Sequence, residues 1–229
     1  MEPIVVIALI LVSIVLFKYI FKIDIKKAEP LKENKELQKY TDKFPENVEV
    51  AKEILQMLGN DKVKIEEAKD TQTSLYIAVT DKILIADMKN NYARIQTIAH
   101  ECLHSVQDRR LLLFNFIISN INLLYLLAIS ILTIAKVVQN TTNHIFILTM
   151  LTIIKFSVRG YLEIDAMTKS KYLAKEYMEN KNILTKKEIS SVIEKYNEIN
   201  NLGVPFTVVH ILIGSLLGVL VYAMIALFV

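Results

Sequence analysis

The sequence predicts a mainly α-helical integral-membrane protein with four transmembrane helices and a small polar part of α+β character. Of its 229 residues, 53% are hydrophobic and 22% are charged, and the two kinds are separated along the chain. Apolar stretches long enough to cross a bilayer, which takes about 20 residues, alternate with charged segments. The single cysteine excludes an intrachain disulfide framework, and the five glycines and four prolines exclude a low-complexity chain.

The first apolar stretch is interpreted as a retained anchor. It follows Met1-Glu2-Pro3 and ends in lysines, whereas a cleavable signal peptide would begin with positive charge and end at a small-residue cleavage site. The third stretch is short, and Lys155 and Arg159 can extend from it to the membrane interface. The predicted order is an anchor over 4–21, a polar segment over 22–110, spans over 111–138 and 144–159, a second polar segment over 160–203, and a last span over 205–229.

The distribution of positive charge predicts the orientation of the chain. Lysines and arginines gather in the two polar segments, whereas the loop between the second and third spans carries only Lys136 at its edge. The positive-inside rule therefore places both polar segments in the cytoplasm and both chain ends outside. The expected location is the plasma membrane, crossed several times. A net charge of only +3 excludes a nucleic-acid partner.

Short elements are predicted inside the polar segments from apolar spacing, residue alternation and turn residues. These elements are a helix over 48–58 stopped by Gly59-Asn60, strands over 74–80 and 82–86, a helix from about residue 91, and helices over 161–178 and 186–199. The exposed edge of such a small sheet could bind an extended peptide as an added strand. The alternative is that the sheet only covers a helix.

The motif His-Glu-x-x-His occupies residues 100–104. On a helix, side chains four residues apart are offset by about 40°, so His100 and His104 can reach one Zn²⁺. Glu101 is turned by about 100° from His100, and there its carboxylate could take a proton from metal-bound water and pass it to a leaving amine. Coincidence is the alternative, but two of the four histidines of the chain fall in this motif. Cys102 lies on the far side of the helix and is expected in the core.

A third protein ligand is needed, because a catalytic zinc site has three protein ligands and keeps its fourth position for water. His144 falls in the outer loop and is expected to be a loop polar group. His210 falls inside the last span, where a role in helix packing is expected. Glu163 is better placed, because two spans separate it from His104 and return the chain to the same side of the membrane.

The pairing of an H-E-x-x-H-x-x-Q block with a later E-x-D-A block, separated by membrane spans, resembles the YugP-type membrane-bound zinc metallopeptidases, a gluzincin-like family. HtpX-like membrane peptidases are more distantly similar. The resemblance covers the whole chain, and the matching positions are His100, Glu101, His104, Gln107, Glu163, Asp165 and Ala166. It departs from the family at Leu103 and Ser105, where the family usually has Gly and Ala, and at the shortened segment 88–94.

The resemblance implies a zincin-like polar part that holds one Zn²⁺ per chain. Glu163 would be the third ligand, and Asp165 and Gln107 would support the ligands from behind. Asp165 could instead cap or solvate its helix, and Gln107 could be an ordinary interfacial polar residue.

The function expected from the sequence is that of a membrane-embedded zinc endopeptidase with Glu101 as general base. At the helical rise, His104 precedes Leu111 by about 10 Å and Glu163 follows Arg159 by about 6 Å, so the metal should lie near the membrane surface. Membrane-proximal proteins or peptides are therefore the expected substrates, and the lipid bilayer is the other partner. The alternative is a catalytically silent metal-binding scaffold or regulator. A channel or carrier lacks support, because the spans carry no paired ionisable groups.

Overall fold

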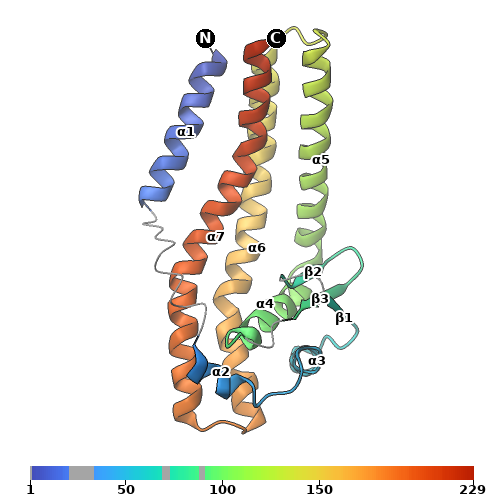
Figure 1. The fold of residues 1–229 in the computed structure, drawn as a ribbon. Coiled ribbons are helices and arrows are strands. Elements are labelled where there is room, and N and C mark those ends of the chain that lie inside the picture. Colours follow the sequence, from blue (N-terminus) through green and yellow to red (C-terminus); the bar gives the residue numbers. More distant parts are fainter. Residues whose placement is uncertain (1, 21–33, 69–72, 88–90) are drawn as a thin grey trace. The chain divides into compact units, whose positions relative to one another are not determined.

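The computed structural model describes residues 2–20, 34–68, 73–87 and 91–229 (Figure 1). The elements follow one another as α1 (Glu2–Ile20), α2 (Lys35–Thr41), α3 (Asn47–Met57), β1 (Lys64–Ala68), β2 (Leu75–Ile77), β3 (Lys82–Ala86), α4 (Arg94–Val106), α5 (Arg109–Ile134), α6 (Thr141–Lys181) and α7 (Lys186–Phe228). Residues 88–90 of the shortened segment before the motif lie outside the described residues.

Contacts within the chain divide it into two compact units. We call residues 1–23, 110–161 and 205–229 the helical unit, and residues 24–109 and 162–204 the polar unit. The long helices α6 and α7 contribute residues to both units.

In the helical unit, α5, α6 and α7 are long and apolar enough to cross a membrane, while the apolar part of α1, Pro3–Leu16, is shorter. α5 can run for 26 residues because it contains no glycine or proline and no charge after Arg110. Residue 21, where the first predicted span ends, and the lysines from 22 to 32 that support the predicted orientation lie outside the described residues. The predicted mainly helical fold with long apolar helices and a small sheet is confirmed, and the fourth span stays a prediction.

A small core and several polar contacts join the helices of the helical unit. The core includes Ile129, Leu148 and Val219, whereas much of the outer apolar surface of α5, including Leu124 and Ile131, is exposed. Hydrogen bonds between helices join Asn122 to Thr152 (3.3 Å), Tyr125 to His144 (2.8 Å), and Thr133 to Tyr222 (3.1 Å). Contacts of this kind are what hold helices together where the surroundings are apolar.

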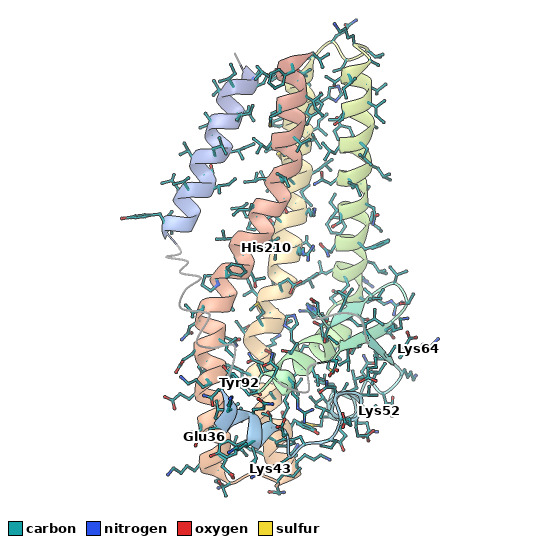
Figure 2. All side chains as sticks on the ribbon, viewed as in Figure 1. Glu36, Lys43, Lys52, Lys64, Tyr92 and His210 are labelled. Atoms are coloured by element: carbon teal, nitrogen blue, oxygen red, sulfur yellow. The ribbon has the colours of Figure 1, made fainter. Side chains whose placement is uncertain are left out.

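In the polar unit, three strands form a sheet in the order β1-β3-β2, with β3 parallel to β1 and antiparallel to β2. One face of the central strand β3 buries Ile83 and Ile85 completely. These residues belong to a core shared with α3, α4 and the parts of α6 and α7 in this unit, which includes Ile54, Ile98, Met178 and Tyr196. Figure 2 labels the charged side chains of Lys43, Lys52 and Lys64, which are exposed around this core.

The start of α4 is fixed by a buried arginine. Arg94, 3% exposed, donates through Nη1 to the Pro45 carbonyl (2.9 Å) and to Asn47 Oδ1 (2.9 Å). Its Nη2 donates to the carbonyls of Thr41 (2.7 Å) and Phe44 (2.9 Å). Arg94 therefore attaches the connection between α2 and α3 to the helix that carries the histidine motif.

The elements differ from the predicted ones at several places. The helix over 48–58 and the stop at Gly59, which has φ 66°, were predicted correctly. The helices predicted over 161–178 and 186–199 are parts of α6 and α7, which continue through Gly160 and Pro205. Glycine weakens a helix by only about 1 kcal/mol, and a proline can kink a helix without ending it. Strand β1 and helix α2 were not predicted, because β1 is charged and mostly exposed and α2 is only seven residues long.

Candidate metal centre

The histidine motif lies on α4 of the polar unit, as the sequence predicts. This helix buries Ile95, Ile98 and Cys102 on one side. His100 and His104 occupy the neighbouring face and meet Glu163, which lies near the start of the part of α6 that belongs to the polar unit. The structure thus brings together the three residues that the sequence singles out as metal ligands.

The three ligand atoms are close to one another. His100 Nε2 lies 3.1 Å from His104 Nε2. Glu163 Oε2 lies 3.5 Å from His100 Nε2 and 3.8 Å from His104 Nε2. Among the described residues, His100, His104 and Glu163 therefore form a group whose ligand atoms are close enough together to hold one metal ion.

The spacing of these atoms fits a tetrahedral metal. Ligands bound to Zn²⁺ at about 2.0–2.1 Å in a tetrahedron are separated by about 3.3–3.4 Å. The three separations of 3.1, 3.5 and 3.8 Å lie within about half an ångström of that value. Two imidazoles and one carboxylate are also a donor set used in catalytic zinc sites, so both geometry and chemistry fit such an ion.

Gln107 connects one of these histidines to α6. Its Oε1 lies 2.8 Å from His104 Nδ1, and its Nε2 donates to the Leu162 carbonyl (2.8 Å) and to Asp165 Oδ2 (3.0 Å). Because the amide nitrogen of Gln107 is occupied by two acceptors, its oxygen is the group that faces the ring. His104 Nδ1 must then carry the proton, which leaves Nε2 free to bind a metal.

Asp165 is more than a solvated helix residue. Besides accepting from Gln107, it forms an ion pair with Lys169 one turn further along α6. These positions are consistent with the prediction that Gln107 and Asp165 support the ligands, since Gln107 contacts the Nδ1 side of the His104 ring and Asp165 accepts from Gln107. Whether they affect metal binding stays a prediction.

Glu101 lies beside the group of three rather than within it. Its side chain is buried, with 7% exposure, and its Oε2 accepts a 2.7 Å hydrogen bond from the backbone N–H of Tyr76 in β2. Burial raises the pKa of Glu101, while the nearby His100 and His104 act in the opposite direction. A buried carboxyl with a raised pKa next to possible metal ligands is suited to accept and return a proton.

The ligand residues affect one another's protonation. Burial alone would raise the pKa of Glu163, but hydrogen bonds from His100 and His104 hold that pKa well below its ordinary range. Burial alone would lower the pKa of His104, but Glu163 and Glu101 raise it. The Glu163 carboxylate and the His104 imidazole therefore each favour the charged form of the other. A metal ion binding here would compete with protons for these atoms.

The other histidines weighed from the sequence lie elsewhere, in the helical unit. The prediction that His144 is a loop residue was wrong, because His144 lies in the first turns of α6 and bonds to Tyr125 of α5. His210, labelled in Figure 2, stacks on Phe206 of the same helix with ring centroids 6.1 Å apart. Cys102 is fully buried, as expected for a core residue.

Leu103 and Ser105, two of the positions at which the sequence departs from the pattern it resembles, have structural roles. Leu103 belongs to the core, and the Ser105 hydroxyl donates to the Cys102 carbonyl (2.6 Å) and accepts from Asn60 Nδ2 (3.1 Å). Neither residue is among the three possible ligands.

Two backbone groups that bond to residues of the candidate site were not predicted from the sequence. They are the N–H of Tyr76, which donates to Glu101, and the carbonyl of Leu162, which accepts from Gln107. A backbone group has no residue-type signal, so only the strand pairing and helix packing could reveal them. The closest sequence-based prediction for Tyr76 was that the small sheet before the motif has an exposed edge.

Comparison with protein-family models, with curated proteins and with solved structures gives no match. The class of the protein therefore rests on its own geometry. Within the described residues, it is a mainly helical protein with three helices long and apolar enough to cross a membrane and a His-His-Glu group that could hold a metal ion.

Proposed function

We propose that this protein is an integral-membrane, zinc-dependent endopeptidase of the kind that its motifs resemble, the YugP-type family. The observation that carries the proposal is the convergence of His100, His104 and Glu163 to within 3.1–3.8 Å of one another, with Glu101 buried beside them. A structural metal site needs the three ligands but has no use for an additional buried carboxylate at that position.

In this proposal each residue has a separate role. His100, His104 and Glu163 would hold one Zn²⁺ as the three protein ligands of a catalytic zinc site, which binds water as its fourth ligand. The bound ion would polarise the scissile carbonyl and lower the pKa of the water. Glu101 accepts the proton of the attacking water and later donates it to the leaving amine. Gln107 keeps the Nε2 atom of His104 free of a proton and aimed at the ion.

The substrates proposed are membrane-proximal proteins, cleaved on the cytoplasmic side of the plasma membrane. Support comes from α5, α6 and α7, which are long and apolar enough to cross a membrane, and from the gathering of lysine and arginine in the polar segments. The short stretches of sequence between the predicted spans and the ligands add to this support. Four spans, including α1, complete the proposed topology.

The test uses the full-length protein purified in detergent micelles. Zinc content is measured by mass spectrometry, and hydrolysis is followed with fluorescein-labelled casein. Wild-type protein should hold about one zinc per chain and cleave casein. Glu101→Gln should keep the zinc and lose at least about 100-fold in rate, because only the proton acceptor is removed. His104→Ala should lose both zinc and activity.

Two outcomes would contradict the proposal. Equal loss of zinc in Glu101→Gln and His104→Ala would refute the division of roles. Full zinc occupancy without any difference in casein cleavage between wild type and Glu101→Gln would favour a silent metal-binding scaffold instead.

A further inference from the structure

Strand β2 is at an edge of the sheet and pairs with β3 on one side. Tyr76 is opposite Ile83 in this antiparallel pair. In such a pair, the residues of a strand alternate between directing both backbone polar groups toward the partner strand and directing both away from it. The N–H of Tyr76 donates to Glu101 of α4, so Tyr76 is one of the residues whose backbone groups face away from β3.

The contact between Tyr76 and Glu101 is short and sheltered. The distance of 2.7 Å from the Tyr76 nitrogen to Glu101 Oε2 is typical of a hydrogen bond to an ionised acceptor. Glu101 is 7% exposed, so little water competes for that oxygen. The strand that supplies the donor is itself held, because the Tyr76 hydroxyl donates to Asp81 Oδ1 (2.9 Å) across the turn to β3.

We propose that the backbone N–H of Tyr76 is the positioning group for Glu101. It fixes Oε2 and so orients the carboxylate with Oε1 left for the attacking water. This inference rests on the proposed function and deepens it. A glutamate side chain has several rotatable bonds, and a misplacement of a reacting group by about 1 Å can cost about 100-fold in rate. A backbone donor in a paired strand limits that motion without adding a further side chain.

The same contact restricts how a peptide can bind. A substrate that added to β2 as a further strand would need the outward-facing N–H groups of that strand. The N–H of Tyr76 is already bonded to Glu101, so a peptide cannot use it while the base stays in place. At Tyr76, the edge of β2 therefore hydrogen-bonds to Glu101 and not to a bound peptide.

Proline substitution removes this N–H. Tyr76→Pro deletes the N–H, and the pairing with β3 is kept because that N–H does not face β3. Tyr76→Pro also deletes the hydroxyl that bonds to Asp81, so Tyr76→Ala, which lacks the same side chain but keeps the N–H, is the matched control. Ala78→Pro is a second control, for the introduction of a proline. Ala78 is the second residue of a turn closed by the Thr80 N–H to the Ile77 carbonyl (3.3 Å), a position where proline is favoured.

The kinetic test uses full-length protein in detergent micelles and fluorescein-labelled casein. Tyr76→Pro should lower kcat by about 10- to 100-fold, with KM and zinc content unchanged, because the base is present but no longer held. Ala78→Pro should keep the wild-type kcat. Tyr76→Ala, which keeps the N–H, should have a kcat at least tenfold above that of Tyr76→Pro. Equal kcat values for Tyr76→Pro and Tyr76→Ala would overturn the inference. If wild type and Glu101→Gln cleave casein equally, the proposed function itself fails, which is a different result.

A second measurement does not depend on activity or on how Tyr76→Pro folds. Residue-resolved amide hydrogen exchange should show the Tyr76 N–H protected in wild-type protein. Glu101→Ala should speed exchange at Tyr76 by tenfold or more, while Ile77, the neighbouring residue of β2, exchanges as in wild type. Glu163→Ala should leave Tyr76 protected. Unchanged exchange at Tyr76 in Glu101→Ala would refute the contact, whatever the protease assay gives.

Discussion

Removing the Gln107 side chain should weaken metal binding although Gln107 is not itself a ligand. Gln107→Ala deletes the 2.8 Å contact with His104 Nδ1 and the two hydrogen bonds to the Leu162 carbonyl and Asp165, at 2.8 and 3.0 Å. His104 could then rotate or change tautomer. In addition, α4, which carries the two histidines, would lose a link to α6, which carries Glu163. Loss of such a supporting group costs about 10- to 100-fold in metal affinity, which is about 1.4–2.8 kcal/mol.

The assay for this prediction is zinc competition against a fluorescent chelator, with the absorption spectrum of the Co²⁺-substituted protein as a check of ligand geometry. Gln107→Glu separates the two halves of the contact. Its carboxylate can still accept from His104, but it cannot donate to Leu162 and would face the negative charge of Asp165. Gln107→Glu should therefore also bind zinc more weakly than wild type. Gln56→Ala, at an exposed position of α3, is the control. If Gln107→Ala binds zinc as tightly as Gln56→Ala, the reasoning from hydrogen-bond geometry is wrong.

The remaining predictions concern the third ligand, the topology and pH. Glu163→Ala should lower zinc affinity strongly, whereas His144→Ala and His210→Ala should match wild type in the same competition assay; wild-type occupancy in Glu163→Ala would require a different ligand. In a Cys102→Ser background, an impermeant thiol reagent applied outside intact cells should label a cysteine at position 142 but not one at position 186; labelling at 186 would break the proposed orientation. In the metal-free protein, the pKa of Glu163 is lower in the folded than in the unfolded state. Its ionised carboxylate therefore stabilises the fold at pH values above about 4.5, the pKa of the unfolded state, and this stabilisation is lost as the pH falls. The pKa of His104 is higher in the folded than in the unfolded state. His104 therefore stabilises the fold fully at pH values below about 6.5, the pKa of the unfolded state, and this stabilisation is lost as the pH rises. The thermal midpoint of metal-free wild type should therefore fall on both sides of the range from about 4.5 to 6.5, and a Glu163→Gln profile of the same shape would contradict the pairing.

The long helices and the histidine motif could be predicted because their signals are local. Apolar runs identify α5 and the apolar parts of α6 and α7, and the spacing of four residues puts His100 and His104 on one face of α4. Glu163 is 59 positions after His104, and its prediction rested on two non-local arguments: the spans return it to the same side as His104, and its E-x-D-A block resembles that of a known family. The structure brings it to within 3.8 Å of His104.

The features that were missed depend on backbone position rather than residue type. Strand β1 has the sequence Lys-Ile-Glu-Glu-Ala and lacks an alternating pattern, so only its pairing with β3 defines it. The N–H of Tyr76 and the carbonyl of Leu162 have the same chemistry as in any other residue. The continuity of α6 was also missed, because the sequence predicted a span that ends at residue 159 and a separate helix over 161–178, whereas the helix runs on through Gly160.

Arg94 has a consequence for how the sequence of this protein can vary among its relatives. Three of the four acceptors of its guanidinium are backbone carbonyls, those of Thr41, Phe44 and Pro45. Any residue supplies a carbonyl, so the exposed positions between α2 and α3, Asp42 and Lys43, can change as long as the loop keeps its length and path, whereas Phe44 is also held by the core. Lysine cannot replace Arg94, because a single ammonium group cannot reach acceptors arranged around a planar fork. Among homologous sequences we therefore expect an invariant arginine six positions before the first motif histidine, facing a loop of constant length that varies at its exposed positions and keeps an apolar residue at 44.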